Sequence, residues 1–313
     1  MLSNNLSWSA YIDDVYAKAM KRLGIIQHFK YKLDRNSLER FYVAYVLPIL
    51  EYADIVWSGA TGRDLAKLDK VHVSAMRIVT GATARSNVNG LYEDIGWHDL
   101  STRRKIHRLR WFYKILNNLA PQYLVDILPP NVNQRQNYNL RCGNNISQIP
   151  AMKELYLRSY FPSTIKEWNN LPEHIREAPI LSSFNRALAA HFVPPVRVPW
   201  YGTGDRLCDI HHTRMRLGCS LLKGHLHYNL HVEDDPSCRC GNEIEDPYHF
   251  FFVCPLYDNQ RRMLLESLSH SIPDVAPRLS ILLRGDPRST NTINEHIFNF
   301  VHVYFKDTKR FNI

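Results

Sequence analysis

The sequence contains no long hydrophobic run. Its longest apolar stretch, from Phe41 to Leu50, has ten residues, whereas a helix that crosses a bilayer needs about 20. The start of the chain lacks the basic segment and the apolar core of a secretory signal peptide. Cysteine is scarce, with six in 313 residues, which argues against a disulfide framework. We therefore expect an intracellular protein in a reducing compartment, without a membrane partner.

Common catalytic motifs are also missing, since the sequence has no P-loop, no G-x-G-x-x-G and no G-x-S-x-G. One motif looks catalytic: residues 11–14 spell YIDD, which matches the YxDD box of reverse transcriptases. That box lies on a β-hairpin turn, but here the pattern after it is helical, and Ile12 belongs to an apolar helical stripe. A two-metal site also needs an upstream carboxylate, and only ten residues precede Tyr11. We interpret YIDD as a chance match and predict no catalytic residue.

Acidic residues are nearly absent between residues 100 and 153. Asp126 is the single acid there, against nine lysines and arginines, in a chain whose net charge is +9. Such a concentration of one sign favours a polyanionic partner, and nucleic acid is the most common one. A solvated basic face without a partner is the alternative.

The pattern of apolar residues predicts a mainly α fold. Apolar residues at spacings of three and four predict helices over residues 12–26, 36–57, 63–80, 101–118, 163–170 and 182–192. Pro48 is expected to kink or break the second of these, and Gly81 to close the third. Residues 129–160 are rich in Asn, Gln, Pro and Gly, which predicts loops with short strands near 138–141 and 155–160.

These elements suggest four consecutive parts. A helical bundle is expected over residues 1–128 and a connector of loops, short strands and helices over 129–193. A Pro- and Gly-rich linker follows at 194–204. A smaller helical domain is expected over 205–313.

The helix predicted at 101–118 carries much of the basic charge. Leu109, Phe112 and Tyr113 mark its apolar side, and basic residues repeat on roughly the opposite side. The residues predicted to contact nucleic acid are Arg103, Arg104, Lys105, His107, Arg108, Arg110 and Lys114. Trp111 lies near them and would either stack on a base or pack under a neighbouring segment.

The C-terminal part contains a metal-binding pattern. Cys238 and Cys240 form a C-x-C pair, and His249 and Cys254 follow after eight and four further residues. Three thiols and one imidazole are the ligand set of a closed tetrahedral zinc site. Gly241 permits a turn after the first pair, and Asp246-Pro247 predicts the N-cap and first residue of a helix that begins near His249. We predict a structural Zn²⁺, with free or disulfide-bonded cysteines as the alternative.

Other histidines lie close to this pattern, at positions 211, 212, 225, 227 and 231. Together with Cys208 or Cys219 they would be able to form a second metal site. Polar surface or capping roles are the simpler interpretation.

Seven segments in order carry a family resemblance. They are LSWSAYIDDVYAKAMKRLG, YVLPILEYADIVWSG, LDKVHVSAMRIVTGA, LYEDIGWHDLSTRRKIHRLRWFYKILN, FPSTIKEWNNLPEHIR, CRCGNEIEDPYHFFFVCPLY and INEHIFNFVHVYFKDTKRF. Together they resemble the region after the palm in reverse transcriptases of non-LTR, LINE-type retrotransposons. The resemblance covers nearly the whole chain and implies a thumb-like bundle, a connector and a zinc-knuckle domain.

The same resemblance implies partners and location. The thumb would pack along an RNA template or an RNA–DNA duplex, and the knuckle domain would help to hold RNA or target DNA, with no small-molecule substrate. Such a protein is expected in the nucleus or in a cytoplasmic ribonucleoprotein. The palm of the family is absent from these residues, so we expect a nucleic-acid-binding fragment that is inactive alone. Two alternatives are part of an active RNA-directed DNA polymerase with an upstream palm, and a zinc-dependent protein-interaction module.

Overall fold

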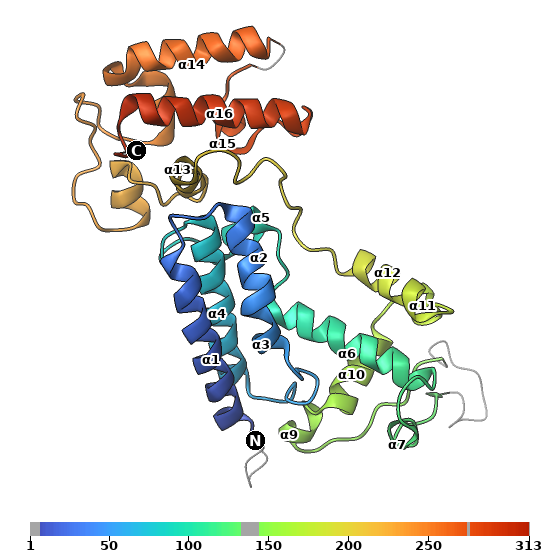
Figure 1. The fold of residues 1–313 in the computed structure, drawn as a ribbon. Helices are drawn as coiled ribbons and strands as arrows, with labels where there is room; N and C mark the ends of the chain where they lie inside the picture. The colour runs from blue at the N-terminus through green and yellow to red at the C-terminus, as the bar shows by residue number, and fades with distance from the viewer. Residues whose placement is uncertain (1–6, 133–143, 274–275, 313) are drawn as a thin grey trace. The chain divides into compact units, whose positions relative to one another are not determined.

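The computed structural model describes residues 7–132, 144–273 and 276–312 (Figure 1). Helices make up 61% of the structure, which confirms the mainly α fold predicted from the sequence. Within the described residues, extended pairing is limited to one isolated antiparallel bridge between Asn131 and Ile146. None of the described helices is long and apolar enough to cross a membrane.

The helices follow one another in a simple order along the chain. They are α1 (Ser9–His28), α2 (Arg35–Tyr45), α3 (Leu47–Glu51), α4 (Gly62–Thr80), α5 (Val88–Ile95), α6 (Leu100–Leu116), α7 (Gln122–Val125), α9 (Glu154–Leu157), α10 (Tyr160–Asn169), α11 (Glu173–Arg176), α12 (Leu181–His191), α13 (Arg206–Arg216), η1 (His225–Asn229), η2 (His249–Val253), η3 (Pro255–Tyr257), α14 (Asp258–Ser271), α15 (Leu279–Arg284) and α16 (Asn291–Thr308).

Contacts group these helices into two compact units. Unit 1 comprises Met1–Ala19, Leu47–Lys70 and His98–Pro194, and unit 2 comprises Met20–Val46, Val71–Trp97 and Pro195–Ile313. The boundary between the units falls inside α1 and inside α4. Both units therefore combine segments that are distant in sequence, whereas the expected domains were consecutive. The expected boundaries at 128, 193 and 204 stay a prediction.

The core of unit 1 forms around α6. Leu109, Phe112 and Tyr113 are buried, as their spacing predicts, and they pack with Trp168 of α10 and Phe184 of α12. The rings of Tyr113 and Phe184 stack with centroids 4.3 Å apart. The apolar side of the basic helix is thus correctly read from the sequence.

The core of unit 2 is built by α13, α14, α15, α16 and η2. Helices α14 and α16 pack side by side (Figure 1). Phe298 and Phe305 of α16 are fully buried, and the expected linker contributes Trp200 and Tyr201 to the same core. Nε1 of Trp200 donates a hydrogen bond to the Arg284 carbonyl at 2.9 Å. Part of the Pro- and Gly-rich stretch is therefore anchored by aromatic side chains.

Local sequence signals set several helix ends. The second predicted helix is interrupted as expected: α2 ends at Tyr45, and α3 begins at Leu47 with Pro48 in its first turn, where proline is tolerated. Gly81, with φ of +78°, follows the last residue of α4. The carboxylate of Asp99 caps α6 by accepting from the N–H of Thr102 at 2.9 Å.

The strand expected at 155–160 is wrong. Residues 154–157 form the short helix α9, and α10 begins at Tyr160. Leu155, Tyr156 and Leu157 are all exposed, so this apolar run does not alternate between a buried and an open face as a strand would. The other expected strand, at 138–141, lies outside the described residues.

Candidate metal centre and basic helix

Three thiols and one imidazole converge within unit 2. The ligand atoms of Cys238, Cys240, His249 and Cys254 all lie within 4.8 Å of one another. Sγ of Cys238 is 3.7 Å from Sγ of Cys254, and Sγ of Cys240 is 3.3 Å from Nε2 of His249. Two thiolates that bind one zinc at about 2.3 Å with tetrahedral angles lie about 3.8 Å apart. The four predicted ligands therefore come together in a geometry that is compatible with a closed zinc site.

A tight turn presents the first pair of ligands. The N–H of Gly241 donates to the Cys238 carbonyl at 3.0 Å, and the N–H of Cys238 donates to the Asn242 carbonyl at 2.9 Å. Gly241 has φ of +96°, a conformation that residues with a side chain rarely adopt. The turn predicted from this glycine is present, and it places both cysteines on one short loop.

A single π-helical turn, η2, presents the second pair. Pro247 starts the helical segment, and the Asp246 carboxylate accepts from the N–H of His249 at 2.7 Å, as the expected N-cap. The N–H of Cys254 donates to the His249 carbonyl at 2.8 Å, which is the i→i+5 bond of a π turn. In an α-helix, residues five apart lie about 140° apart around the axis. The wider turn therefore helps to bring His249 and Cys254 to the same side.

The thiols of the cluster differ in acidity. Burial raises the pKa of Cys254 to about 12 and also raises the pKa of Cys238. Burial acts in the same direction at Cys240, but hydrogen bonds, first that from the Asn242 backbone, outweigh it and lower the pKa of this thiol. Zinc binds thiolates, so binding at this site would release protons, and zinc affinity would fall as the pH falls.

The candidate zinc site is continuous with the core of unit 2. Phe250 and Phe251, which lie between the last two ligands, are fully buried. The Tyr304 hydroxyl of α16 donates to the Phe250 carbonyl at 2.6 Å. Nη1 of Arg261, on α14, donates to the Cys254 carbonyl at 2.9 Å. The ligand segment is thereby tied to the two long helices of this core.

A buried carboxylate that the sequence analysis did not identify holds the loop between the ligand pairs. Glu245 is 4% exposed and accepts hydrogen bonds from Nε and Nη2 of Arg310 at 2.7 and 2.6 Å. It also accepts from the N–H of Lys223 at 2.9 Å. Burial alone would raise the pKa of Glu245, but the hydrogen bonds from Arg310 and Lys223 outweigh burial and lower it. No local motif marks this residue, because Arg310 is 65 residues away.

The nearby histidines have other partners. The His211 ring stacks on Phe311 with centroids 4.8 Å apart, and Nε2 of His212 lies 2.8 Å from the Leu282 carbonyl. Across the described part of the chain, the four predicted zinc ligands are the one group of three or more His, Cys, Asp or Glu side chains close enough to share a metal. The described residues therefore do not bring these histidines together as a second metal site, but His211 and His212 are buried core residues, so the surface or capping role expected for them is wrong.

More than half of the predicted nucleic-acid face of α6 is engaged by acidic side chains inside unit 1. Three of its seven basic residues form ion pairs, which are Arg103 with Glu51, Arg104 with Asp69 and Arg108 with Glu167. A fourth, His107, places Nδ1 2.6 Å from the Asp54 carboxylate. Arg104 is also buried, with 5% of its surface exposed. The open basic face expected from the sequence is therefore restricted, because acids from other segments fold back onto the first half of the helix.

The remaining three basic residues of α6 are Lys105, Arg110 and Lys114. Within the described residues none of these three forms an ion pair. Nζ of Lys114 lies 5.2 Å from the centre of the Trp111 ring, and Nζ of Lys105 lies 5.3 Å from the centre of the Phe192 ring. Arg110 and Lys114 are four residues apart and share a face, whereas Lys105 lies on a different side of the helix. Arg110 and Lys114 therefore form the uncompensated end of the predicted surface.

A buried charge cluster in unit 2 was not predicted from the sequence. The carboxylate of Asp94, at the end of α5, forms an ion pair with Nη1 of Arg35 of α2 at 2.7 Å and accepts from Nε of Arg216 of α13 at 3.0 Å, and all three side chains are at most 4% exposed. Burial alone would raise the pKa of Asp94, but the two guanidinium groups outweigh burial and lower it. Because the arginines lie 59 and 122 residues away, only the fold reveals this cluster.

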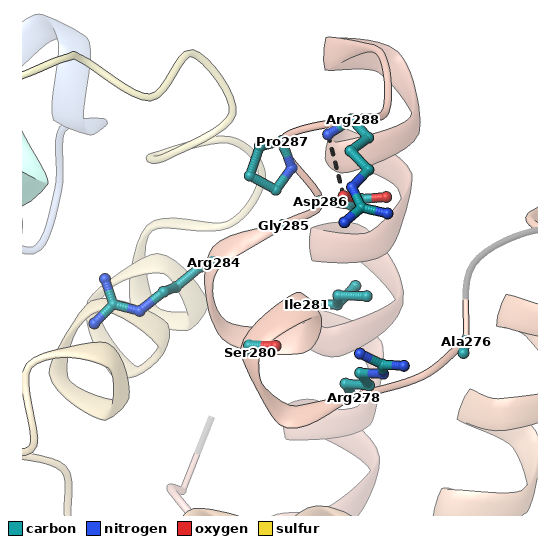
Figure 2. Close-up of a pocket in the computed structure, with 9 residues that line it drawn as sticks. All are labelled: Ala276, Arg278, Ser280, Ile281, Arg284, Gly285, Asp286, Pro287 and Arg288. Atoms are coloured by element: carbon teal, nitrogen blue, oxygen red, sulfur yellow. Dashed lines mark hydrogen bonds between the residues drawn. The ribbon is translucent and has the colours of Figure 1, made fainter.

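Three arginines line a surface pocket of about 520 Å³ beside α15 (Figure 2). They are Arg278, Arg284 and Arg288. Figure 2 shows the Arg284 side chain extending away from the other two, so the guanidinium groups do not converge on one point. Asp286 also lines the pocket and accepts from the N–H of Arg288 at 3.1 Å. The pocket adds positive charge to unit 2 without forming a site for a single anion.

Comparisons with protein-family models, with curated proteins and with solved structures found no match to this chain.

Proposed function

We propose that this chain is a zinc-containing, nucleic-acid-binding region of a LINE-type reverse transcriptase, without the catalytic palm. The convergence of Cys238, Cys240, His249 and Cys254 carries the proposal. Four protein ligands fill a tetrahedral shell and leave no open position for substrate, so the metal is structural. Its role is to hold the ligand loop against the core of unit 2.

The nucleic-acid part of the proposal is supported by charge and by the family resemblance. The chain has a net charge of +9, and such an excess attracts the phosphate backbone without regard to sequence. Arg110 and Lys114 supply a pair of uncompensated charges on one face of α6, with Trp111 beside them. The partners proposed on this basis are an RNA template, an RNA–DNA duplex or target DNA.

Neutralising Arg110 and Lys114 is expected to weaken duplex binding mainly at low salt. The logarithm of the binding constant falls as the logarithm of the salt concentration rises. If each side chain neutralises one phosphate, this fall becomes less steep in the double variant Arg110→Gln/Lys114→Gln, by about 0.9 per lost contact. Fluorescence anisotropy with a labelled RNA–DNA duplex over a series of salt concentrations measures this slope.

Lys105→Gln is the matched control, because it removes the same charge from a different side of the same helix. The assignment predicts an unchanged slope for this control. Equal slopes for the double variant and the parent chain would exclude this face of α6 as the contact surface.

A further inference from the structure

Three aromatic side chains form a row along one face of α2 and the turn that follows α1. Phe41 and Tyr45 are four residues apart on α2 and share one face, with ring centroids 5.6 Å apart. Phe29 extends the row, with its centroid 6.3 Å from that of Phe41. Phe41 and Tyr45 are 36% and 38% exposed. Phe29 is half-buried, and we refer to Phe29, Phe41 and Tyr45 as the aromatic row.

An arginine holds one end of the aromatic row in place. Cζ of Arg22 lies 4.6 Å from the centre of the Tyr45 ring, and its Nη1 donates to the Tyr45 carbonyl at 2.9 Å. The guanidinium group thus combines a cation–π contact with a hydrogen bond across the two helices. A ring that is fixed in this way loses little conformational entropy when a ligand stacks on it.

The charges around the aromatic row are mostly positive. Residues 20–46 contain six lysines and arginines and two acidic side chains. Both acids are already engaged: Asp34 caps α2 by accepting from the N–H of Ser37 at 2.9 Å, and Glu39 accepts from Arg197 at 2.9 Å.

Three of the basic side chains remain uncompensated. Lys21, Lys32 and Arg40 are exposed and form no ion pair within the described residues. The segments that carry the aromatic row therefore also carry exposed cations without an ion pair, and this combination of residue types is typical of a site for single-stranded nucleic acid.

We propose that the aromatic row stacks on the unpaired bases of a single-stranded nucleic acid, while Lys21, Lys32 and Arg40 contact its phosphates. This inference rests on the proposed nucleic-acid function and adds a second contact surface to it. The rings of Phe41 and Tyr45 pack edge to face at an interplanar angle of 72°, and those of Phe29 and Phe41 are tilted by 41°. Their faces therefore point in different directions, which suits bases that are unstacked from one another, as they are in an unpaired strand, and not the parallel stack of a duplex.

The test uses the whole chain and a labelled single-stranded oligouridine RNA of about 15 nucleotides, which spans the usual size of such sites. The variant Phe41→Leu/Tyr45→Leu removes two rings but keeps the surface apolar. Each stacked ring is expected to strengthen binding by about fivefold, the lower end of the range for base–aromatic stacking. Without two rings, the variant should therefore bind about 25-fold more weakly. Its salt slope should stay unchanged, because the lysines and Arg40 remain.

Two controls separate stacking from other effects. Tyr45→Phe keeps the ring and should bind like the parent chain. Tyr123→Leu removes an exposed ring from α7, far along the sequence from the row, and should also leave the affinity unchanged. By contrast, the salt dependence of binding should become less steep in the triple variant Lys21→Gln/Lys32→Gln/Arg40→Gln. The expected change is about 0.7 in the slope for each phosphate contact that is lost on a single strand.

The outcomes distinguish this inference from the proposed function. The parent chain is expected to bind both duplex and single strand. If it does, but Phe41→Leu/Tyr45→Leu keeps full affinity for the single strand, the aromatic row is not the single-strand site, and the proposed nucleic-acid function stands. If the parent chain binds neither nucleic acid, both proposals fail. If the parent chain sediments as a dimer and the Phe41→Leu/Tyr45→Leu variant sediments as a monomer, the aromatic row is a dimer interface, and the inference is overturned.

Discussion

Replacing Cys240 with serine is expected to release the zinc and to unfold residues 236–260 locally. Structural zinc supplies on the order of 10 kcal/mol to a small module at neutral pH, which exceeds what the backbone hydrogen bonds of the turn at Cys238 and Gly241 contribute. Cys240 is the least buried of the three thiols, so its replacement leaves no large cavity. Limited proteolysis combined with mass spectrometry should show new cleavage within 236–260. His249→Ala is expected to have the same effect.

The matched control for this experiment is Arg239→Ser. It places the same new residue one position earlier in the same turn, and Arg239 is an exposed side chain that is not a ligand. The control should retain one zinc and the protease resistance of the parent chain. Equal resistance of Cys240→Ser and Arg239→Ser would contradict a structural role for the metal.

Loss of the metal should also affect helices outside the ligand segment. Phe250 and Phe251 belong to the core that includes α16, and the Tyr304 hydroxyl binds the Phe250 carbonyl. Unfolding of the ligand segment would expose these rings and leave one side of α16 uncovered. The unfolding of unit 2 is therefore expected to depend on zinc, which hydrogen exchange of α16 amides in the presence of a chelator would detect.

The second large effect is expected at Asp94. Asp94→Asn removes the carboxylate that pairs with both Arg35 and Arg216 and leaves Asp209 as the buried acid that still acts on these two arginines. Removing one partner of a buried ion pair typically costs about 3–5 kcal/mol in the free energy of unfolding. Urea unfolding at neutral pH measures the cost. Glu93→Gln, at the exposed neighbouring position, is the control and should change stability by less than about 0.5 kcal/mol.

The same variant has a defined pH dependence. The folded state lowers the pKa of Asp94 below the unfolded value of about 3.9. The carboxylate therefore contributes its full stability above the unfolded pKa, and this contribution is lost as the pH falls through the folded pKa. The difference between the parent chain and Asp94→Asn should be constant from pH 7 to about pH 5 and shrink in stronger acid. A difference that grows on acidification would contradict the assigned ion pairs.

The parts of this structure that were predictable depend on local chemistry. The four ligands lie within 17 consecutive residues, and two signals that are visible in the sequence, the glycine turn and the Asp-Pro helix start, help to position them. The apolar side of α6 follows from helical periodicity alone. The π turn itself was not predicted, because its i→i+5 bond has no simple sequence pattern.

The features that were missed depend on long-range contacts. The basic residues of α6 were identified correctly, but their partners Glu51, Asp54, Asp69 and Glu167 lie 35 to 59 residues away. Helix α5 was not predicted, although Asn87 caps its start and Gly96, with φ of +73°, ends it. The strand expected at 155–160 failed because a short apolar run has no fixed conformation without a pairing partner.

We propose above all that three sulfurs and one nitrogen of this chain bind a single zinc ion. X-ray absorption spectroscopy of the purified protein is the most direct test of this proposal, because the spectrum reports the number and type of the zinc ligands. We expect one zinc per chain, with three sulfur ligands at about 2.3 Å and one nitrogen ligand at about 2.0–2.1 Å. Zinc bound only by oxygen and nitrogen, or a chain that binds no zinc when its thiols are fully reduced, would contradict it.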